Sequence, residues 1–311
     1  MKISKIRQKA GTVTVLTLLW LTSACNKQPS TASSAELLAF KEFTQGTGKI
    51  AFAAQVSEDV MFDLYYIEAG TGKLYQITQN LNADIAPDFS RDGLRMVFSS
   101  DRRGTYDLFT INLPSGGPIL VFDNSADETE PRFSPDGTWI AYQSNGYGDN
   151  DIFIVSPDSG EPLRLTKEDT QDTQPAWSPD GKQIAFVSDR DGDFEIFLMN
   201  ADGSEVKQIT SSTDYKAAPV WSPDSKRLAF ISKRGSHFQL FQIELATDVE
   251  KQLTDFSGTV HSPAWSPDGK YIAYILDSGE GSQVNVYELS SKTSYRVTSG
   301  FYEYAGLTWS Q

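Results

Sequence analysis

Few residues of this 311-residue sequence have the types and spacings that catalysis or metal binding requires. The chain has two histidines, His237 and His261, and one cysteine, Cys25. None of the patterns H-E-x-x-H, C-x-x-C or G-x-S-x-G occurs. A zinc site needs about four nitrogen, sulfur or acidic ligands, and nucleophilic catalysis needs a serine or cysteine beside a base. The sequence therefore predicts no catalytic centre, no metal site and no cofactor.

Two short segments resemble binding loops only in part. Gly70-Thr71-Gly72-Lys73 and Gly46-Thr47-Gly48-Lys49 lack both the first glycine of a phosphate loop and the Ser or Thr after the lysine. Asp189-Arg190-Asp191-Gly192-Asp193 has its glycine two places too early for a calcium loop, and no glutamate stands at the twelfth position. We interpret residues 70–73 and 189–193 as hairpin turns, with calcium binding at 189–193 as the alternative.

The elements that must position any site follow a fixed repeat. Six aromatic residues stand 44 residues apart, and five of them open related motifs of the form WSPDG. They are Phe89, Phe133, Trp177, Trp221, Trp265 and Trp309. A period of this length with four short strand-like runs is typical of a β-propeller blade. One such aromatic residue per blade predicts packing between blades rather than a sugar-binding ladder.

Residues 175–210 show the repeat most clearly. Residues 175–178 predict a short inner strand, and Ser178-Pro179-Asp180-Gly181 predicts a type I turn. The apolar run Gln183–Ser188, the segment Glu195–Met199 and the segment Val206–Thr210 predict three further strands. Most copies close with an apolar residue and threonine, but one reads Val121-Phe122 instead.

The two ends of the chain supply complementary parts of one blade. Residues 48–78 contain the second, third and fourth strands of a repeat, and residues 307–310 contain a lone inner strand. Pairing 307–310 with 49–54 would complete the sixth blade and leave no open sheet edge. The predicted fold is an all-β, six-bladed β-propeller closed by its N- and C-terminal strands.

The repeat WSPDG…IAF…SDR…IF…DG…IT resembles the TolB-type, WD-like propeller repeat of bacterial envelope proteins, over residues 48–310. The resemblance implies a six-bladed propeller that binds other proteins, with its axial channel as a docking site. TolB carries an α/β domain before its propeller, whereas here only residues 25–47 precede it. These residues are rich in Ser, Thr, Gln and Pro at first and predict a flexible tether, with a capping box at Ser33–Glu36 that favours one short helix.

The first 24 residues predict a secretory signal peptide. A basic start is followed by the apolar run Val13–Leu21, which is too short to span a bilayer. Leu21-Thr22-Ser23-Ala24-Cys25 resembles a bacterial lipobox, although the leucine stands one place early. We expect cleavage before Cys25 and its lipidation; the alternatives are ordinary cleavage that leaves a free thiol, or an uncleaved anchor. The mature domains are then the lipidated tether, 25–47, and the propeller, 48–311.

The charge balance restricts the partners. The chain has 41 acidic and 27 basic residues, and loss of residues 1–24 removes four positive charges, which leaves a net charge of −18. This argues against nucleic acid and against direct contact with anionic lipid. We expect a monomer in the periplasm or outside the cytoplasm that touches a membrane only through its lipid anchor.

The predicted loops between the fourth strand of one blade and the inner strand of the next carry much of this charge. These six loops, 79–86, 123–130, 167–174, 211–218, 255–262 and 299–306, hold eleven acids and two lysines. Because propeller loops of one kind share a face, they would ring one channel mouth, either as a solvated surface or as a binding face for a cationic partner. The predicted partner-binding residues are Asp84, Asp127, Glu128, Glu130, Asp172, Lys216, His261 and Glu303.

Glu128, Glu130 and Asp172 are expected to crowd one sector of this mouth, and His261 to lie in a channel-side loop where a plain surface role is the simpler interpretation. The function that this pattern favours is a non-enzymatic envelope scaffold that docks a protein or a basic peptide segment. The alternative is a propeller enzyme, such as a metal-dependent lyase or a hydrolase, acting on a polysaccharide or a small molecule.

Overall fold

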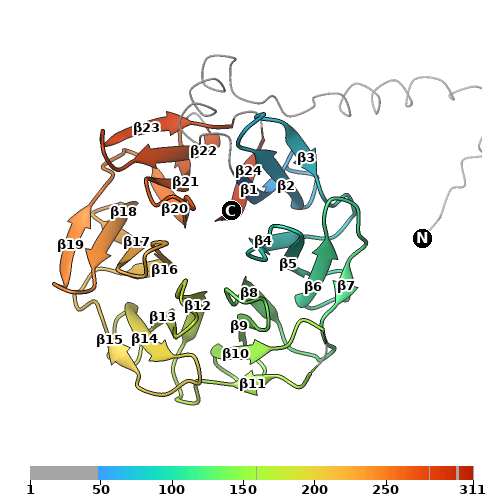
Figure 1. Cartoon of the computed structure of the whole chain (residues 1–311), viewed down its shortest axis with the longest axis horizontal. Helices are drawn as coiled ribbons and strands as arrows, with labels where there is room; N and C mark the ends of the chain where they lie inside the picture. Colours follow the sequence, from blue (N-terminus) through green and yellow to red (C-terminus); the bar gives the residue numbers. More distant parts are fainter. Residues whose placement is uncertain (1–47, 159, 280, 299–300, 311) are drawn as a thin grey trace, which may run out of the picture.

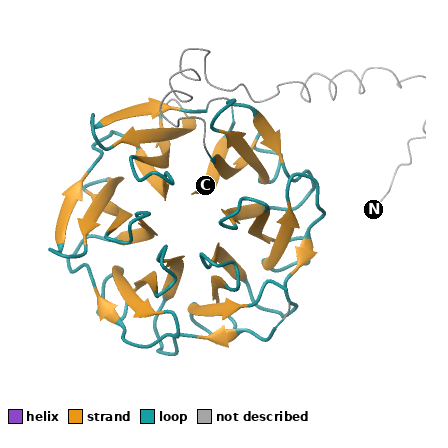
Figure 2. Ribbon diagram, in the orientation of Figure 1, coloured by secondary structure: helices purple, strands orange, loops and turns teal. Residues whose placement is uncertain are grey.

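The computed structural model describes residues 48–158, 160–279, 281–298 and 301–310. They form six four-stranded sheets around a central channel, as Figure 1 shows. Every regular element in these residues is a strand, and loops join the strands in Figure 2. The predicted all-β, six-bladed propeller is confirmed.

We call the sheets blades A to F in ring order and give their strands from the channel outward. Blade A contains β24 (Glu303–Trp309), β1 (Lys49–Gln55), β2 (Asp63–Glu68) and β3 (Leu74–Gln76). Blade B contains β4 (Asp84–Phe89), β5 (Arg95–Ser100), β6 (Asp107–Asn112) and β7 (Ile119–Leu120). Blade C contains β8 (Glu128–Phe133), β9 (Ile140–Ser144), β10 (Asp151–Val155) and β11 (Leu163–Arg164). Blade D contains β12 (Asp172–Trp177), β13 (Gln183–Ser188), β14 (Glu195–Asn200) and β15 (Lys207–Gln208). Blade E contains β16 (Lys216–Trp221), β17 (Arg227–Arg234), β18 (His237–Glu244) and β19 (Val249–Gln252). Blade F contains β20 (Thr259–Trp265), β21 (Tyr271–Ser278), β22 (Gly281–Glu288) and β23 (Thr293–Arg296).

The ring is closed by antiparallel pairing of the last strand, β24, with the first, β1. Ile50 pairs with Trp309 at one end of this ladder, and Gln55 pairs with Glu303 at the other. The backbone nitrogen of Ser310 also donates to the carbonyl of Lys49 at 2.9 Å. The predicted closure is confirmed, and it extends four residues further toward the N-terminal end of β24 than the sequence indicated.

The inner strands are longer than expected because each continues past a bulge. In blade D the ladder shifts between Thr173 and Ala176, and Gln174 there has a φ of 53°. A bulge adds one residue and restores pairing beyond it. The last three or four residues of each predicted loop therefore belong to the inner strand, so Asp84, Glu128, Asp172 and Lys216 begin strands instead of lying in loops.

The WSPDG motif forms the predicted turn between the first two strands of a blade. The Gly181 nitrogen donates to the Ser178 carbonyl at 2.8 Å, and the Ser178 hydroxyl donates to Asp180 at 2.7 Å. The hydrogen bond from Ser178 holds the pKa of Asp180 below its usual range. Equivalent turns follow four other inner strands, and we call this side of the ring the SPDG face.

The repeated aromatic residues pack between blades, as expected. Trp221 and Trp265 are buried, and their indole nitrogens donate to carbonyls of the preceding inner strand, at Ala176 (3.0 Å) and Val220 (3.2 Å). Each ring therefore contributes both apolar contact and a hydrogen bond across a blade boundary. Trp177 is half-buried, and its indole nitrogen has no hydrogen-bond partner.

The signal peptide, the lipidation site Cys25 and the tether lie outside the described residues and stay predictions. No helix within the described ranges is long and apolar enough to cross a membrane.

Deletion of residues 305–311 tests the closure. It removes buried Leu307 and Trp309 and exposes the inner edge of β1. Loss of a single large core side chain costs about 2–5 kcal/mol, so we expect the melting temperature to fall by roughly 10 °C or more. Tyr302→Ala, at an exposed residue before β24, is the matched control and should melt like the wild type. A truncated protein with an unchanged melting curve would contradict the closed ring.

Candidate binding channel

The channel wall is built from the bulges of the six inner strands. At each bulge one residue has a φ between 49° and 54°, namely Ala86, Glu130, Gln174, Ala218, Ser262 and Gly306. In five blades a proline follows, which fixes the next φ and removes an N–H that would otherwise point into the bulge. At Gly306 a Cβ atom would lie 2.8 Å from the Cα of Ala86, so this position requires glycine.

One mouth of the channel opens on the face that carries the loops between blades, which we call the loop face. A cavity of about 390 Å³ lies there, lined by blades C, D, E and F and by β24 of blade A. Its apolar wall includes Ile231, Phe238, Val260 and Leu307. Tyr215 extends this wall through ring contacts with Phe194 and Phe238, with centroid distances of 5.0 and 5.8 Å. The cavity falls in the size range of sites that hold small ligands or single side chains.

The opposite side of the cavity is charged. Arg132 lies 3.1 Å from the Glu130 carboxylate and also faces Asp88 deeper in the channel. Asp88 accepts hydrogen bonds from the Phe133 nitrogen and the Thr308 hydroxyl, each at 2.8 Å. Burial nevertheless raises the pKa of Asp88, since its carboxylate is drawn into the ring away from bulk water.

His261 lies in the cavity wall within a hydrogen-bonded chain. Its Nε2 is 3.0 Å from Asp277 Oδ2, and its Nδ1 is 3.1 Å from the Ser262 hydroxyl. Although burial opposes the change, hydrogen bonds from His261 and Ser282 hold the pKa of Asp277 below its usual range. The arrangement fixes the imidazole at the mouth, so His261 is the best oriented of the predicted site residues there.

Four of the predicted site residues lie inside the ring rather than on its rim. Asp84, Glu128, Asp172 and Lys216 occupy equivalent first positions of four inner strands and are completely buried. Asp84 is 2.8 Å from Arg102, and Asp172 is 3.0 Å from Arg190. The expected crowding of Glu128 and Asp172 at the mouth therefore fails, because only Glu130 of that trio reaches the cavity.

Lys216 replaces the acid in blade E. Its ammonium group donates to the hydroxyls of Ser212 (2.8 Å) and Ser232 (3.3 Å) and lies 3.9 Å from Glu250. A buried lysine needs such partners to offset its lost hydration. Lys216 therefore has a structural role: its side chain fills the space that an acid occupies in the equivalent blades, and these partners offset its buried charge.

The remaining predicted residues are accessible. Glu303 is exposed, Asp127 and Glu130 are half-buried, and His261 is half-buried in the cavity wall. Asp127 also has a structural task, since it accepts a hydrogen bond from the Tyr106 nitrogen at 3.0 Å. Exposed acids that share the loop face are Asp123, Glu168, Asp169 and Asp255.

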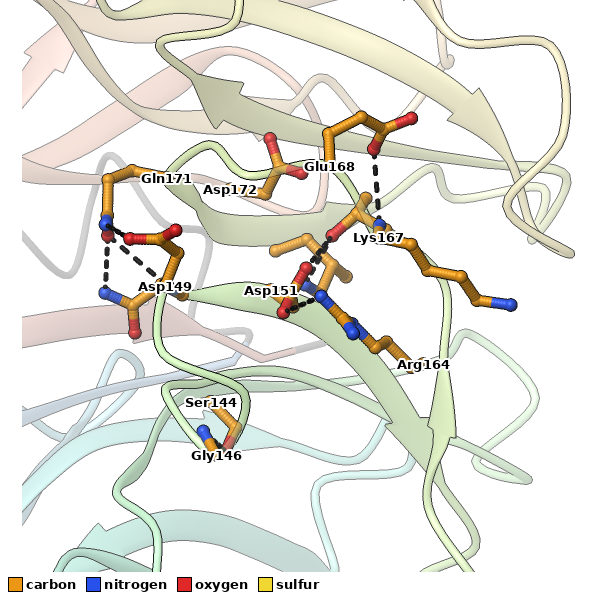
Figure 3. Close-up of polar contacts among 12 residues, drawn as sticks. Ser144, Gly146, Asp149, Asp151, Arg164, Lys167, Glu168, Gln171 and Asp172 are labelled. Atoms are coloured by element: carbon orange, nitrogen blue, oxygen red, sulfur yellow. Dashed lines mark hydrogen bonds and ion pairs between the residues drawn. The ribbon is translucent and has the colours of Figure 1, made fainter.

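A second set of buried acids was missed from the sequence. The third strands of four blades begin with Asp63, Asp107, Asp151 and Glu195, each next to the inner strand of the following blade. In Figure 3, Arg164 reaches Asp151 at 2.7 Å, with Asp172 on the neighbouring strand. The recurrence of these acids every 44 residues is visible in the sequence, but the spacing alone does not indicate that their side chains are buried.

The boundary between blades B and C lacks the donors that the others have. Threonine donates to Asp63 and Asp151 at 3.3 Å, but Phe122 stands at the equivalent position beside Asp107. Arginine pairs with Asp84 and Asp172, but Gly146 stands at the equivalent position beside Glu128.

The Asp107–Glu128 pair is correspondingly short of partners. Both carboxylate oxygens of Asp107 and Oε2 of Glu128 are buried without a hydrogen bond, although Arg103 lies 3.4 Å from Asp107. Burial, helped by the charge of Asp107, raises the pKa of Glu128 to about 7. Burial likewise raises the pKa of Asp107. Glu128 is therefore partly protonated at neutral pH.

Among the described residues, no group of three or more His, Cys, Asp or Glu side chains is placed to hold a metal ion.

The model of the TolB beta propeller domain matches residues 119–311 of this chain. No curated protein matches it.

Similar solved structures include TolB proteins and an enzyme. TolB from Acinetobacter baumannii is 19% identical with a TM-score of 0.75, and the match covers 86% of this chain and 67% of that one. A putative TolB from Agrobacterium tumefaciens is 20% identical with a TM-score of 0.65, covering 81% and 89%. An oligogalacturonate lyase in complex with manganese is 16% identical with a TM-score of 0.59, covering 83% and 75%. At these identities the likeness shows the fold alone.

The Asp107–Glu128 pair predicts a loss of stability as pH rises. The folded pKa of Glu128, about 7, lies above its ordinary 4.5, so the protonated form contributes stability that is complete below pH 4.5 and lost through pH 7. Glu128→Gln should reduce the difference in unfolding free energy between pH 5 and pH 8 by roughly 2 kcal/mol. Chemical denaturation at the two pH values measures this difference.

Gly146→Arg is the complementary variant, since it introduces into blade C the arginine that blades B and D carry at the equivalent position. It should raise stability at pH 8 and flatten the pH dependence in the same way. If the unfolding free energies of both variants change with pH as that of the wild type does, protonation of Glu128 is not the cause of the change.

Proposed function

The chain belongs to the TolB beta propeller domain family, and on that premise we propose that it is a non-enzymatic protein-binding scaffold of the bacterial cell envelope. Its binding site is the loop-face mouth of the channel, and its partner presents a basic or N-terminal segment. Pairing of β24 with β1 completes the sixth sheet within one chain, so no blade is left for a second copy to complete, which suits a monomer.

The observation that supports this site best is the combination of an apolar cavity with a rim of accessible acids. The wall of Ile231, Phe238 and Val260 provides apolar area, which supplies most of the affinity in binding pockets. Exposed carboxylates around it, such as Asp255 and Glu303, attract a cationic segment and speed its association.

The buried acids have a different role in this proposal. Asp84 and Asp172 are neutralised by Arg102 and Arg190, so they add little to the field at the mouth. Glu130, Asp127, His261 and Glu303 remain as predicted contact residues, with Lys216, Asp84, Glu128 and Asp172 holding the blades beneath them.

The direction of the chain determines how an anchored propeller would face. Gly48 lies against Trp309 and Ser310, and Lys49 donates to the carbonyl of Gly93 at 3.2 Å, all on the SPDG face. A tether from Cys25 would therefore join the propeller on the SPDG face and leave the acidic loop face unobstructed for partners in the envelope.

The alternative function, a propeller enzyme, has one feature in its favour, the Ser262–His261–Asp277 chain in the cavity wall. In serine hydrolases the acid of such a chain is buried and orients the base. Here the Asp277 side chain is 47% exposed, and the serine and histidine are adjacent in sequence within one bulge. We therefore assign this chain to positioning His261 for binding.

Charge reversal at the exposed rim tests the binding site. Asp255→Lys/Glu303→Lys should reduce capture of the partner from envelope extracts at low salt by about tenfold or more, because paired attraction across an interface is lost. High salt should weaken capture by the wild type as well. Quantitative pull-down at two salt concentrations measures both effects.

The matched control is Glu161→Lys/Glu205→Lys, which reverses two exposed acids in hairpins on the SPDG face. It should capture the partner like the wild type. Equal capture by all three proteins at both salt concentrations would mean that the loop face is only a solubilising surface.

Lipidation of Cys25 is tested by the intact mass of the protein from the membrane fraction. We expect acyl chains on Cys25 after cleavage, because bacterial lipoproteins carry more than one chain and a single chain anchors weakly. Cys25→Ser should release the protein from the membrane. An unmodified, full-length chain in the cytosol would contradict this location.

A further inference from the structure

A second cavity lies on the SPDG face, in the groove between blades C and D. Its volume is about 520 Å³, larger than the cavity at the channel mouth. Its wall combines aromatic, proline and carboxylate side chains, namely Pro135, Asp136, Trp139, Trp177, Pro179 and Asp180. A cavity of this size with aromatic walls and a few polar groups has the character of a ligand site.

Two of the equivalent grooves, between blades B and C and between blades E and F, are filled by arginine. Arg95 lies over the ring of Phe133 at 5.4 Å and donates to the carbonyl of Gly137 at 3.3 Å. Arg227 likewise lies over Trp265 at 4.9 Å. Trp139 occupies the corresponding position beside Trp177 and is 39% exposed. In this groove an indole therefore stands where a guanidinium fills those two, and the space beside it remains open.

Trp177 also differs from its equivalents. The indole nitrogens of Trp221 and Trp265 donate to the preceding inner strand, whereas that of Trp177 has no hydrogen-bond partner. An unmade hydrogen bond on a buried donor costs free energy that a ligand oxygen would recover.

Two ionised carboxylates complete the site. Hydrogen bonds from Ser134 and Ser178, respectively, hold the pKa values of Asp136 and Asp180 below their usual range. These turn hydrogen bonds all reach Oδ1, so Oδ2 of Asp136 is left for a ligand, and Oδ2 of Asp180 has only an exposed lysine, Lys182, at 3.4 Å.

We propose that this groove binds a neutral oligosaccharide. A sugar ring has an apolar C–H face that packs on an indole and hydroxyl groups that donate to carboxylates. A proline-rich segment would cover the same indoles but has few N–H donors, so it would leave both carboxylates desolvated without partners. Arg91 also lines the cavity but balances only one of the two carboxylates, so the groove disfavours an acidic sugar.

The site is independent of the proposed partner site, since it lies on the opposite face. In an anchored protein it would lie on the face that the tether joins, where a glycan would hold the propeller in place while the loop face stays open.

The test uses the purified mature chain and three probes: chitotriose, in its neutral N-acetylated form, trigalacturonate and a proline-rich decapeptide. Calorimetry and tryptophan fluorescence should show binding of the neutral trisaccharide alone. Trp139→Arg, which places in blade C the residue that blades B and E carry, should weaken that binding at least tenfold without loss of fold. Trp139→Tyr should retain most of it.

Tyr215→Ala is the matched control, because Tyr215 is also 39% exposed but lies at the channel mouth. It should bind the trisaccharide like the wild type. The proposal is overturned if the neutral trisaccharide does not bind, if Trp139→Arg binds it as tightly as the wild type, or if the acidic sugar or the peptide binds instead.

Discussion

The pairing of β24 with β1 joins residues at the two ends of the described chain and holds the ring in one register. Without it, blade A would lose its inner strand, and the bulge at Gly306 would no longer meet Ala86 of the adjacent blade B. Each blade packs only against its neighbours, so a gap at one boundary would let the others separate. The depth and width of the channel, and therefore both faces that we consider for binding, depend on this single strand pair.

Once the register is fixed, departures from the repeat become informative. Most equivalent positions perform the same task in every blade, such as the serine and aspartate of the SPDG turn. Three departures lie in or next to blade C: Phe122, which follows the outer strand of blade B, and Gly146 and Trp139 of blade C. The first two leave a pair of buried carboxylates short of donors, and the third lies beside an open groove. In a repeat protein, the neighbouring blades therefore show what each position does when the usual residue is present.

Much of the fold could be predicted from the sequence, whereas the site could be predicted only in part. The 44-residue register and the split blade were enough to give six blades and their closure. Burial of Asp84 and Asp172 could not be predicted, because their arginine partners stand 18 residues away in another strand connection. The bulges were missed for a related reason: a proline follows five of the six and interrupts the alternation by which an inner strand is recognised. The charge counted in the six loops of the sequence therefore overestimates the charge that is accessible at the rim of the channel mouth.

The central claim is that a partner docks at the loop-face mouth of the channel. Site-specific photocrosslinking in intact cells tests it most directly, with the photoreactive amino acid placed at Tyr215 in the mouth or at Val249 on the outer strand of blade E, which is 62% exposed. The account predicts a discrete crosslinked protein from position 215 and none from position 249. Crosslinks of equal yield from both positions, or from position 249 alone, would contradict it.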